Sequence, residues 1–369
     1  MLENAFLIMK IYKTIYLHIL LFNLFALERC FTFSVIIAIY NSARYLKDSI
    51  GSLLNQTIDF KRIQVILVND GSTDETEELC LKYQTKFKKN IFYIKIEHSG
   101  VSKVRNIGMN YARGKFINFL DADDKWDYRA FKNFQLFFKY YKNIDLAAGR
   151  IKFFEADEKY HPLDYKFYKT RIVNLSYEYD SIQLSASSCF FRKSSLKSRY
   201  FKEDVFFCED SRFVNTILLS KPIMGLIKES IYNYRRRSDF SSAINNQKKN
   251  LDFYFSTIKY VSNYLINSSI FLYKKVVPFI QFLIAYDLLF RIQQQPFKTL
   301  GSENLKKYIY IIEEILNHID DRYILEQKIL SNKYKFFTLS KKYKRDLRYD
   351  IELKNNFFIY LKFLALFRS

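Results

Sequence analysis

Two apolar segments of strand length end in carboxylates, about fifty residues apart in the chain. They read VILVNDGSTD at Val65–Asp74 and FINFLDADD at Phe116–Asp124. Such strands are buried in a sheet, and ligands of open α/β sheets bind beyond the carboxyl ends of the strands. The carboxylates that we expect two neighbouring strands to bring to one edge are Asp70, Asp121, Asp123 and Asp124. They require a cation, and a divalent metal that holds a phosphorylated ligand is the simplest choice.

Strands and helices alternate around these two segments, which is typical of βαβ units and a parallel sheet. The predicted strands are Phe33–Ile39, Ile63–Val68, Ile91–Ile96, Phe116–Leu120 and a later Val205–Phe207. The predicted helices run to about Asn55 after caps at Asn41 or Ser42, from Thr73 or Asp74 to about Lys88, from about Ser102 to Ala112, and over Tyr128–Tyr141. The sequence therefore predicts an α/β nucleotide-binding domain.

Composition divides the chain into three regions. Residues 1–30 form an apolar extension, too short and too polar for a confident spanning helix and without a small-residue cleavage site. An early start codon with Met9 as the alternative, a membrane-surface anchor and a packed helix all remain open. Residues 31–243 form the predicted sheet domain, and residues 244–369 a basic helical region with breaks near Pro278, Pro296 and Gly301.

The chain is strongly basic, with 59 Lys and Arg against 38 Asp and Glu and a net charge of +21. That balance favours a polyanionic partner, such as nucleic acid, an anionic membrane or phosphorylated substrates. The sequence has neither zinc-finger spacing nor an aromatic-basic strand of the RRM type, so nucleic acid is not a predicted partner. The four cysteines contain no CxxC pair, which argues against a zinc site or a disulfide framework and favours reduced thiols in the cytosol.

The DxD segment after the second carboxylate strand is the most specific local signal. In an extended segment residues i and i+2 point the same way, so Asp121 and Asp123 can face one site. Asp124 and Asp127 are better explained as caps of the next helix. Trp126, the single tryptophan, is either a core residue or a flat wall for a sugar ring.

Several further polar residues have both a structural and a functional interpretation. Asp70 either caps its turn or accepts a hydrogen bond from a nucleobase. Lys103 and Arg105 either lie on a solvated helix face or contact a diphosphate, and the permanent charge of arginine favours Arg105. Asp210, in the segment Cys208–Asp210, is by itself a plausible helix cap. The segment YRRRSDFSSA, residues 234–243, is either a basic turn or an anion clamp.

Together these segments resemble glycosyltransferase family 2, whose members have a GT-A nucleotide-binding fold. The resemblance runs from Ser34 to about Ala243, over half the chain. The matching segments are SVIIAIYN (34–41), VILVNDGSTDET (65–76), GVSKVRNIGMNYARGKFINFLDADDKW (100–126), CFFRKSSL (189–196), CED (208–210) and YRRRSDFSSA (234–243). The order and spacing of so many segments make the resemblance specific.

The resemblance implies a role for each matching position. Nucleobase and ribose would be held by Ala38, Tyr40 and Asp70, with Asp121 on the ribose and Arg105 and Lys103 beside the nucleotide. Asp123 would bind Mn²⁺ or Mg²⁺. Asp210 would be the catalytic base and Glu209 an acceptor-site neighbour, and Trp126 is the candidate sugar wall. The diphosphate clamp would comprise Arg235 or Arg237 with Ser242. Ala38 stands where the family usually has proline. We expect this replacement to relax the loop without changing the chemistry.

The resulting hypothesis is an inverting, metal-dependent hexosyl- or N-acetylhexosaminyltransferase. It would move a sugar from a nucleotide donor, UDP first, to a hydroxyl of a surface glycan or lipid-linked glycan such as capsule, lipooligosaccharide or teichoic acid. We expect it in the cytoplasm, peripheral on the inner face of the membrane through its basic C-terminal region. The alternatives are a GDP- or CDP-linked donor and a non-catalytic protein that binds polyanions or membranes.

Overall fold

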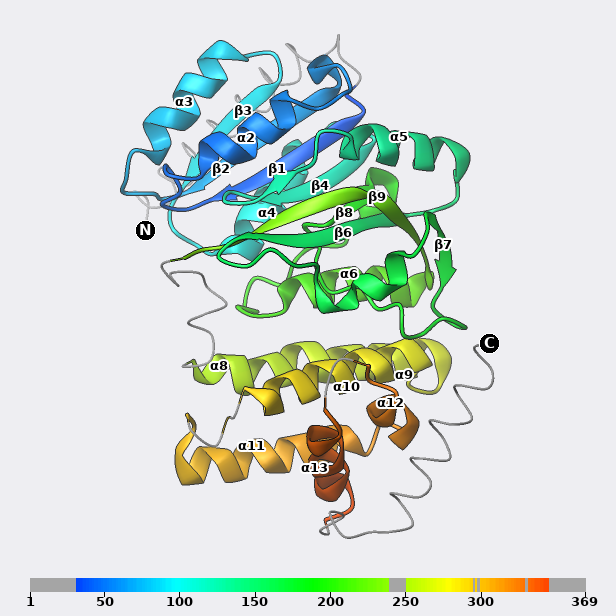
Figure 1. Cartoon of the computed structure of the whole chain (residues 1–369). Helices are drawn as coiled ribbons and strands as arrows, with labels where there is room; N and C mark the ends of the chain where they lie inside the picture. The colour runs from blue at the N-terminus through cyan, green and yellow to red at the C-terminus, as the bar shows by residue number, and fades with distance from the viewer. Residues whose placement is uncertain (1–30, 239–249, 295, 297–298, 329–330, 345–369) are drawn as a thin grey trace, which may run out of the picture.

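The computed structural model describes residues 31–238, 250–294, 296, 299–328 and 331–344. The predicted extension 1–30, Ser242 and the residues after 344 lie outside this part. Figure 1 shows a sheet with helices on both faces and, below it, a separate layer of helices from the last third of the chain. Within the described residues, no helix is both long and apolar enough to span a membrane.

The first half of the sheet is parallel, as the alternating pattern predicts. Its strands are β1 (Phe33–Ile39), β2 (Ile63–Asp70), β3 (Ile91–Ile96) and β4 (Phe116–Asp121), in the order β3-β2-β1-β4. The connecting helices are α2 (Leu46–Leu54), α3 (Thr76–Lys86) and α4 (Val101–Tyr111). Strand β1 lies between β2 and β4, so the expectation that Asp70 and Asp121 end neighbouring strands is wrong. They nevertheless reach one edge, because Ala38 of β1 is in register with both Val68 and Asp121.

The second half of the sheet is mixed and comes from distant parts of the chain. Strand β8 (Cys189–Arg192) pairs antiparallel with β4, and β6 (Leu146–Glu155), β9 (Ile223–Arg236) and β5 (Lys125–Trp126) follow, with β7 (Arg171–Asn174) on β9. Helices α5 (Ala130–Tyr140) and α6 (Glu209–Ser220) belong to this half. The predicted strand Val205–Phe207 is wrong, since those residues are irregular. Short 3₁₀ turns occupy Phe60–Arg62, Pro162–Phe167 and Lys193–Leu196.

The sheet is buried on both faces. Successive side chains of a strand point to opposite faces. Accordingly Val35 and Ile37 of β1 join one hydrophobic cluster, whereas Ile36 joins the other. Near-continuous apolar runs are typical of a parallel strand covered by helices on both sides.

Hydrogen bonds join the loops after β1 and β2, and they explain why the predicted caps of α2 are wrong. Asn41 accepts a hydrogen bond from the Thr73 amide, and the Ser42 amide donates to the Thr76 hydroxyl. Helix α2 begins later, after Tyr45, which makes no side-chain cap bond. Asp74 does provide a hydrogen bond at the start of its helix, as predicted, because its side chain accepts from the amide of Thr76 in the first turn of α3.

The last third of the described chain is helical, as predicted. It comprises α8 (Leu251–Tyr254), a π-helical turn (Ile258–Ser262), α9 (Asn263–Tyr273), α10 (Pro278–Gln293), α11 (Gly301–Leu316), α12 (Asp321–Leu325) and α13 (Asn332–Lys342). Proline suits the first turn of a helix, where its missing amide hydrogen costs nothing. The predicted breaks therefore mark helix starts, at Pro278 and at Gly301, which has a φ of +67°.

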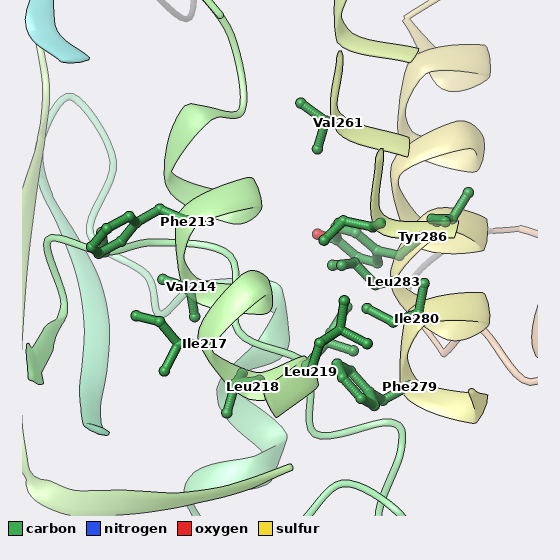
Figure 2. Close-up of a cluster of buried hydrophobic side chains, with 14 of the residues drawn as sticks. Phe213, Val214, Ile217, Leu218, Leu219, Val261, Phe279, Ile280, Leu283 and Tyr286 are labelled. Atoms are coloured by element: carbon green, nitrogen blue, oxygen red, sulfur yellow. The ribbon is translucent and has the colours of Figure 1, made fainter. Parts of the chain in front are cut away.

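This helical region shares a hydrophobic core with the sheet domain. Figure 2 shows Leu219 of α6 facing Phe279, Ile280 and Leu283 of α10, and all four belong to one hydrophobic cluster. Each fully buried aliphatic or aromatic side chain of this kind contributes about 1.5–3 kcal/mol to folding. The boundary near residue 243 thus separates two segments of sequence that depend on a common core.

Candidate active site

Asp70, at the end of β2, fixes the turn that leads into α4. Its side chain is nearly buried, and its two oxygens accept hydrogen bonds from the Ser99 and Gly100 amides at 2.8 and 3.0 Å. His98 lies 3.0 Å from the same carboxylate, and its ring contacts that of Tyr40 in a tilted arrangement, with centroids 4.4 Å apart. Because Tyr40 is 48% exposed, this edge presents an open aromatic surface directly beside Asp70.

Arg105 joins three carboxylates from three elements. The guanidinium, carried by α4, lies 3.0 Å from Asp121 of β4, 3.0 Å from Glu209 and 2.7 Å from Asp210, both in the first turn of α6. Its side chain is only 5% exposed. Although burial lowers the pKa of Arg105, the charges of Asp210, Asp121 and Glu209 raise it above its ordinary value overall. Arg105 is thus the buried cation that holds the strand end against the start of α6.

A loop at residues 182–188, which the sequence did not single out, completes this cluster. The Ser187 hydroxyl donates to the second oxygen of Asp121, and the Ala186 amide donates to the second oxygen of Asp210, both at 2.9 Å. Buried Lys166 holds the loop by donating to the Gln183 side chain at 2.8 Å. Burial lowers the pKa of Lys166 to about 7. Apart from its serines, the sequence of this loop carries no signal for such a role.

The two acidic residues at the start of α6 both have raised pKa values. Burial, followed by the charge of Asp210, raises the pKa of Glu209 to about 7, against the opposing charge of Arg105. Burial also raises the pKa of Asp210, while Arg105 and the Ala186 amide counteract that effect. Both side chains remain partly accessible, at 14% and 19%. A partly accessible carboxyl group with a raised pKa is a candidate for proton transfer near neutral pH.

Asp123 faces Arg237. The guanidinium donates to one oxygen of Asp123 from two nitrogens, at 3.0 and 2.7 Å. Burial raises the pKa of Asp123, and the charge of Arg237 counteracts it. Its neighbour Asp124 is buried and accepts from the Arg235 amide at 2.7 Å. The prediction that Asp124 caps the next helix is therefore wrong, since its side chain binds the backbone of β9 at Arg235. Asp127 accepts from the Ile231 amide of β9, but it also accepts from the amide of Arg129 directly before α5, so its predicted place at the start of that helix is confirmed.

The remaining predicted site residues are distributed unevenly. Arg235 is nearly buried and pairs with Asp48 and Glu155, each at 2.6 Å. Its guanidinium is therefore paired with carboxylates of the protein itself. Lys103 lies exposed on α4. Trp126 is 3% exposed and packs in the core, where its indole donates to Asn118. The structure thus confirms Trp126 as a core residue, and almost none of its ring is exposed to form the wall of a sugar site.

The chain is similar in sequence to a protein family and to individual known proteins. A family model described as Glycosyl transferase family 2 matches residues 34–199. The minor teichoic acid biosynthesis protein GgaA of Bacillus subtilis (strain 168) is 34% identical over 304 residues, which is 80% of this chain and 68% of GgaA.

The chain belongs to glycosyl transferase family 2.

Further relatives agree with the family assignment. The minor teichoic acid biosynthesis protein GgaB of the same bacterium is 36% identical over 336 residues, but the chain spans only 37% of its length. The crystal structure of Staphylococcus aureus TarS 1-349 in complex with UDP-GlcNAc superposes with a TM-score of 0.65 at 21% identity, over 85% of this chain and 88% of that one. Family membership and this likeness confirm the predicted glycosyltransferase class and GT-A fold.

A metal ion fits this family 2 site only together with a ligand. Within the described residues, no group of three or more His, Cys, Asp or Glu side chains could hold an ion. Mg²⁺, however, is often bound by one or two carboxylates plus substrate phosphates and water. Burial raises the pKa of both Asp123 and Asp124, so additional positive charge there would be stabilising. The donor set therefore suits an ion held jointly by Asp123 and a diphosphate.

Proposed function

We propose that this family 2 protein is an inverting, metal-dependent glycosyltransferase that uses a UDP-sugar. Its acceptor would be a hydroxyl group of a teichoic-acid-like surface glycan. The teichoic acid biosynthesis proteins GgaA and GgaB support the acceptor class, and the UDP-GlcNAc bound to TarS supports the donor. The observation that carries the proposal is the Arg105 cluster, because it joins the DxD strand end to Glu209 and Asp210.

The donor would lie along the edge formed by β1, β2 and β4. Tyr40 and His98 offer a ring surface for the base, and Asp70 holds the turn beside it. Asp121 and Asp123 would face the ribose and the metal-bound diphosphate. When bound, the metal would neutralise negative charge that develops on the leaving diphosphate.

The acceptor would meet Asp210. A hydroxyl group has a high pKa and loses its proton as it attacks the anomeric carbon. A new carbon–oxygen bond forms to the acceptor, the bond to the diphosphate oxygen breaks with its electron pair, and Asp210 takes the proton. A single displacement of this kind inverts the anomeric centre. The Ala186 amide and Arg105 would keep the carboxylate of Asp210 aimed at the acceptor.

Calorimetric titration with UDP, GDP and CDP, with Mn²⁺ and with a chelator, tests the donor assignment. We expect UDP binding that requires the metal and that falls at least tenfold in Asp123→Ala, because this change removes the proposed metal ligand. Glu303→Ala is a matched control, since Glu303 is an exposed carboxylate on α11, outside the candidate site.

Other outcomes of this titration lead to defined alternatives. If GDP or CDP bound in preference to UDP, that nucleotide would be assigned to the donor instead. Metal-independent UDP binding, unchanged in Asp123→Ala, would remove the metal from the proposal. Folded protein that binds none of the three nucleotides would support a non-catalytic binding protein.

We also propose that the protein docks on anionic membranes through the corner between α9 and α10. All six residues of this corner, Ile270–Lys275, are exposed, and Phe271 is 78% exposed. Apolar and aromatic side chains beside lysines suit an anionic lipid surface, which attracts basic segments at about 1 kcal/mol per charge. The net charge of +21 acts in the same direction.

Sedimentation with phosphatidylglycerol vesicles tests this docking surface. We expect Phe271→Glu with Leu272→Glu to reduce the bound fraction several-fold without lowering the melting temperature. Tyr310→Glu is the control, because Tyr310 on α11 is 62% exposed but lies on another helix. Unchanged sedimentation of the double variant would refute the surface. Removing the whole helical region is a poor test, because it would strip α6 of its packing partners.

A further inference from the structure

The helical region places one arginine in the interior of the protein. Arg291, on α10, has no exposed surface. Its guanidinium pairs with Asp287 one turn earlier, through nitrogens at 2.8 and 3.1 Å from the two carboxylate oxygens. It also donates to the Phe253 carbonyl and lies 4.0 Å from the centre of the Phe253 ring. Burying a charge is costly unless it is paired and hydrogen-bonded. The partners of Arg291 must therefore compensate the cost of its burial.

The remaining contact of Arg291 crosses to the sheet domain and ends at Cys208. One guanidinium nitrogen lies 3.3 Å from the Cys208 sulfur. Burial, together with the charge of Asp287, raises the pKa of this thiol to about 12, so the sulfur is a neutral acceptor. Cys208 is also the residue at which the chain enters α6, directly before Glu209 and Asp210.

The backbone of Cys208 is in an unfavourable conformation. Its φ of 60° and ψ of 21° lie in the left-handed region, where a side chain clashes with its own backbone. Such a residue persists only where its surroundings determine its conformation, and such residues cluster at functional sites. The Arg291 contact and the burial of the thiol provide that constraint. The conformation of Cys208 in turn sets the direction in which the first turn of α6 presents its two carboxylates.

We propose that Arg291 is a positioning residue for the catalytic base: through Cys208 it fixes the start of α6 and hence the place of Asp210. The inference rests on the proposed function, in which Asp210 removes the acceptor proton. It assigns to the helical region a direct part in the chemistry of the sheet domain. Arg291 itself would touch neither the donor nor the acceptor.

Steady-state kinetics of Arg291→Lys with a UDP-sugar and a glycan acceptor test the proposal. Lysine keeps the charge but loses the planar fork that reaches Asp287, Phe253 and Cys208 together. We expect kcat to fall between about tenfold and a hundredfold, because a misplacement of about 1 Å can cost that much. The donor KM and the affinity for UDP should stay within twofold, since the donor edge on β1, β2 and β4 is not touched.

Arg212→Lys is the matched control. Arg212 also links α6 to the helical region, by donating to the Tyr260 carbonyl and by lying 3.7 Å from the Tyr264 ring centre. Because these contacts bypass the Cys208 thiol, the control loses a similar arginine contact without the proposed effect. We expect kcat of Arg212→Lys to stay within twofold of the wild type. An equal fall of kcat in both variants would mean that general packing is responsible and would overturn the positioning role.

Cys208→Ala provides a second route that leaves Arg291 and its pair with Asp287 in place. Alanine keeps the Cβ atom, and with it the backbone strain, but removes the sulfur that accepts from Arg291. We expect a similar fall in kcat, and a double variant with Arg291→Lys that is no slower than the slower single variant. Additive losses, or a wild-type kcat in Cys208→Ala, would refute action through Cys208. Full turnover in Asp210→Asn would instead defeat the assignment of Asp210 as the base, and wild-type protein that binds no nucleotide would defeat the proposed function, so these failures are distinguishable.

Discussion

Replacing Asp210 by asparagine should lower the rate of sugar transfer by roughly 10²–10⁴-fold, the usual contribution of a general base. Asparagine retains the shape of the side chain, but its single carbonyl oxygen can accept from only one of the two donors, Arg105 or the Ala186 amide. The pair of Arg105 with Glu209 remains, so α6 should keep its place. UDP affinity, measured by calorimetry, should therefore remain within about twofold of the wild type. Product formation from a UDP-sugar under single-turnover conditions measures the chemical step directly.

Glu209→Gln is the control for Asp210→Asn, because Glu209 is the neighbouring carboxylate on the same guanidinium. We expect a smaller loss in this variant. Burial raises the pKa of Asp210, so wild-type turnover should also decline as the pH drops and the base becomes protonated. Wild-type turnover in Asp210→Asn together with an inactive Glu209→Gln would transfer the role of base to Glu209.

Replacing Arg105 by methionine should cost the folded protein about 3–5 kcal/mol at pH 8, because it leaves buried carboxylates without their cation. The deficit should shrink towards acid pH. Without Arg105 the pKa values of Glu209 and Asp210 in the folded state would rise further above those of the unfolded chain. Folded protein then binds protons more tightly than unfolded protein, so acidification stabilises the variant. The relevant window extends from above the wild-type pKa of Glu209, about 7, down to its ordinary value of 4.5.

Urea unfolding of the wild type and of Arg105→Met at pH 8 and at pH 5.5 measures this effect. Arg105→Lys is the matched variant, since it keeps the charge but loses the fork that reaches three carboxylates. The free energy of unfolding of Arg105→Lys should lie between those of the wild type and of Arg105→Met. An equal deficit of Arg105→Met at both pH values would show that lost packing, including the contact with the Phe201 ring, is responsible rather than charge.

The parallel half of the sheet could be predicted because its signals are local. Each of β1 to β4 is an apolar run followed by a polar turn and a helix, and β1 and β3 have the predicted bounds. The mixed half depends on partners far apart in sequence, such as Asn118 of β4 with Phe190 of β8, which periodicity does not reveal. The apolar run Val205–Phe207 resembled a strand, but three residues do not distinguish a strand from a loop that buries Val205.

The sequence predicted which residues belong to the site better than it predicted which of them contact each other. Asp121, Glu209 and Asp210 were all singled out, and the structure brings them together. Their common partner, Arg105, was expected on a diphosphate instead. Helical spacing places a residue on a face of α4 but does not say what that face meets. Ala186 and Ser187 were missed because the first acts through its backbone and the second is a serine in a loop.

The common core of α6 and α10 has a consequence for the construction of chimeric enzymes. The helices that follow residue 250 cannot be exchanged between relatives as an independent module, because Leu219 of α6 packs against side chains of α10. A graft that retains function must take α6 with it, and α6 begins with Glu209 and Asp210. The acidic pair would therefore be inherited with the C-terminal helices, and the natural crossover point lies before Cys208 rather than at residue 243.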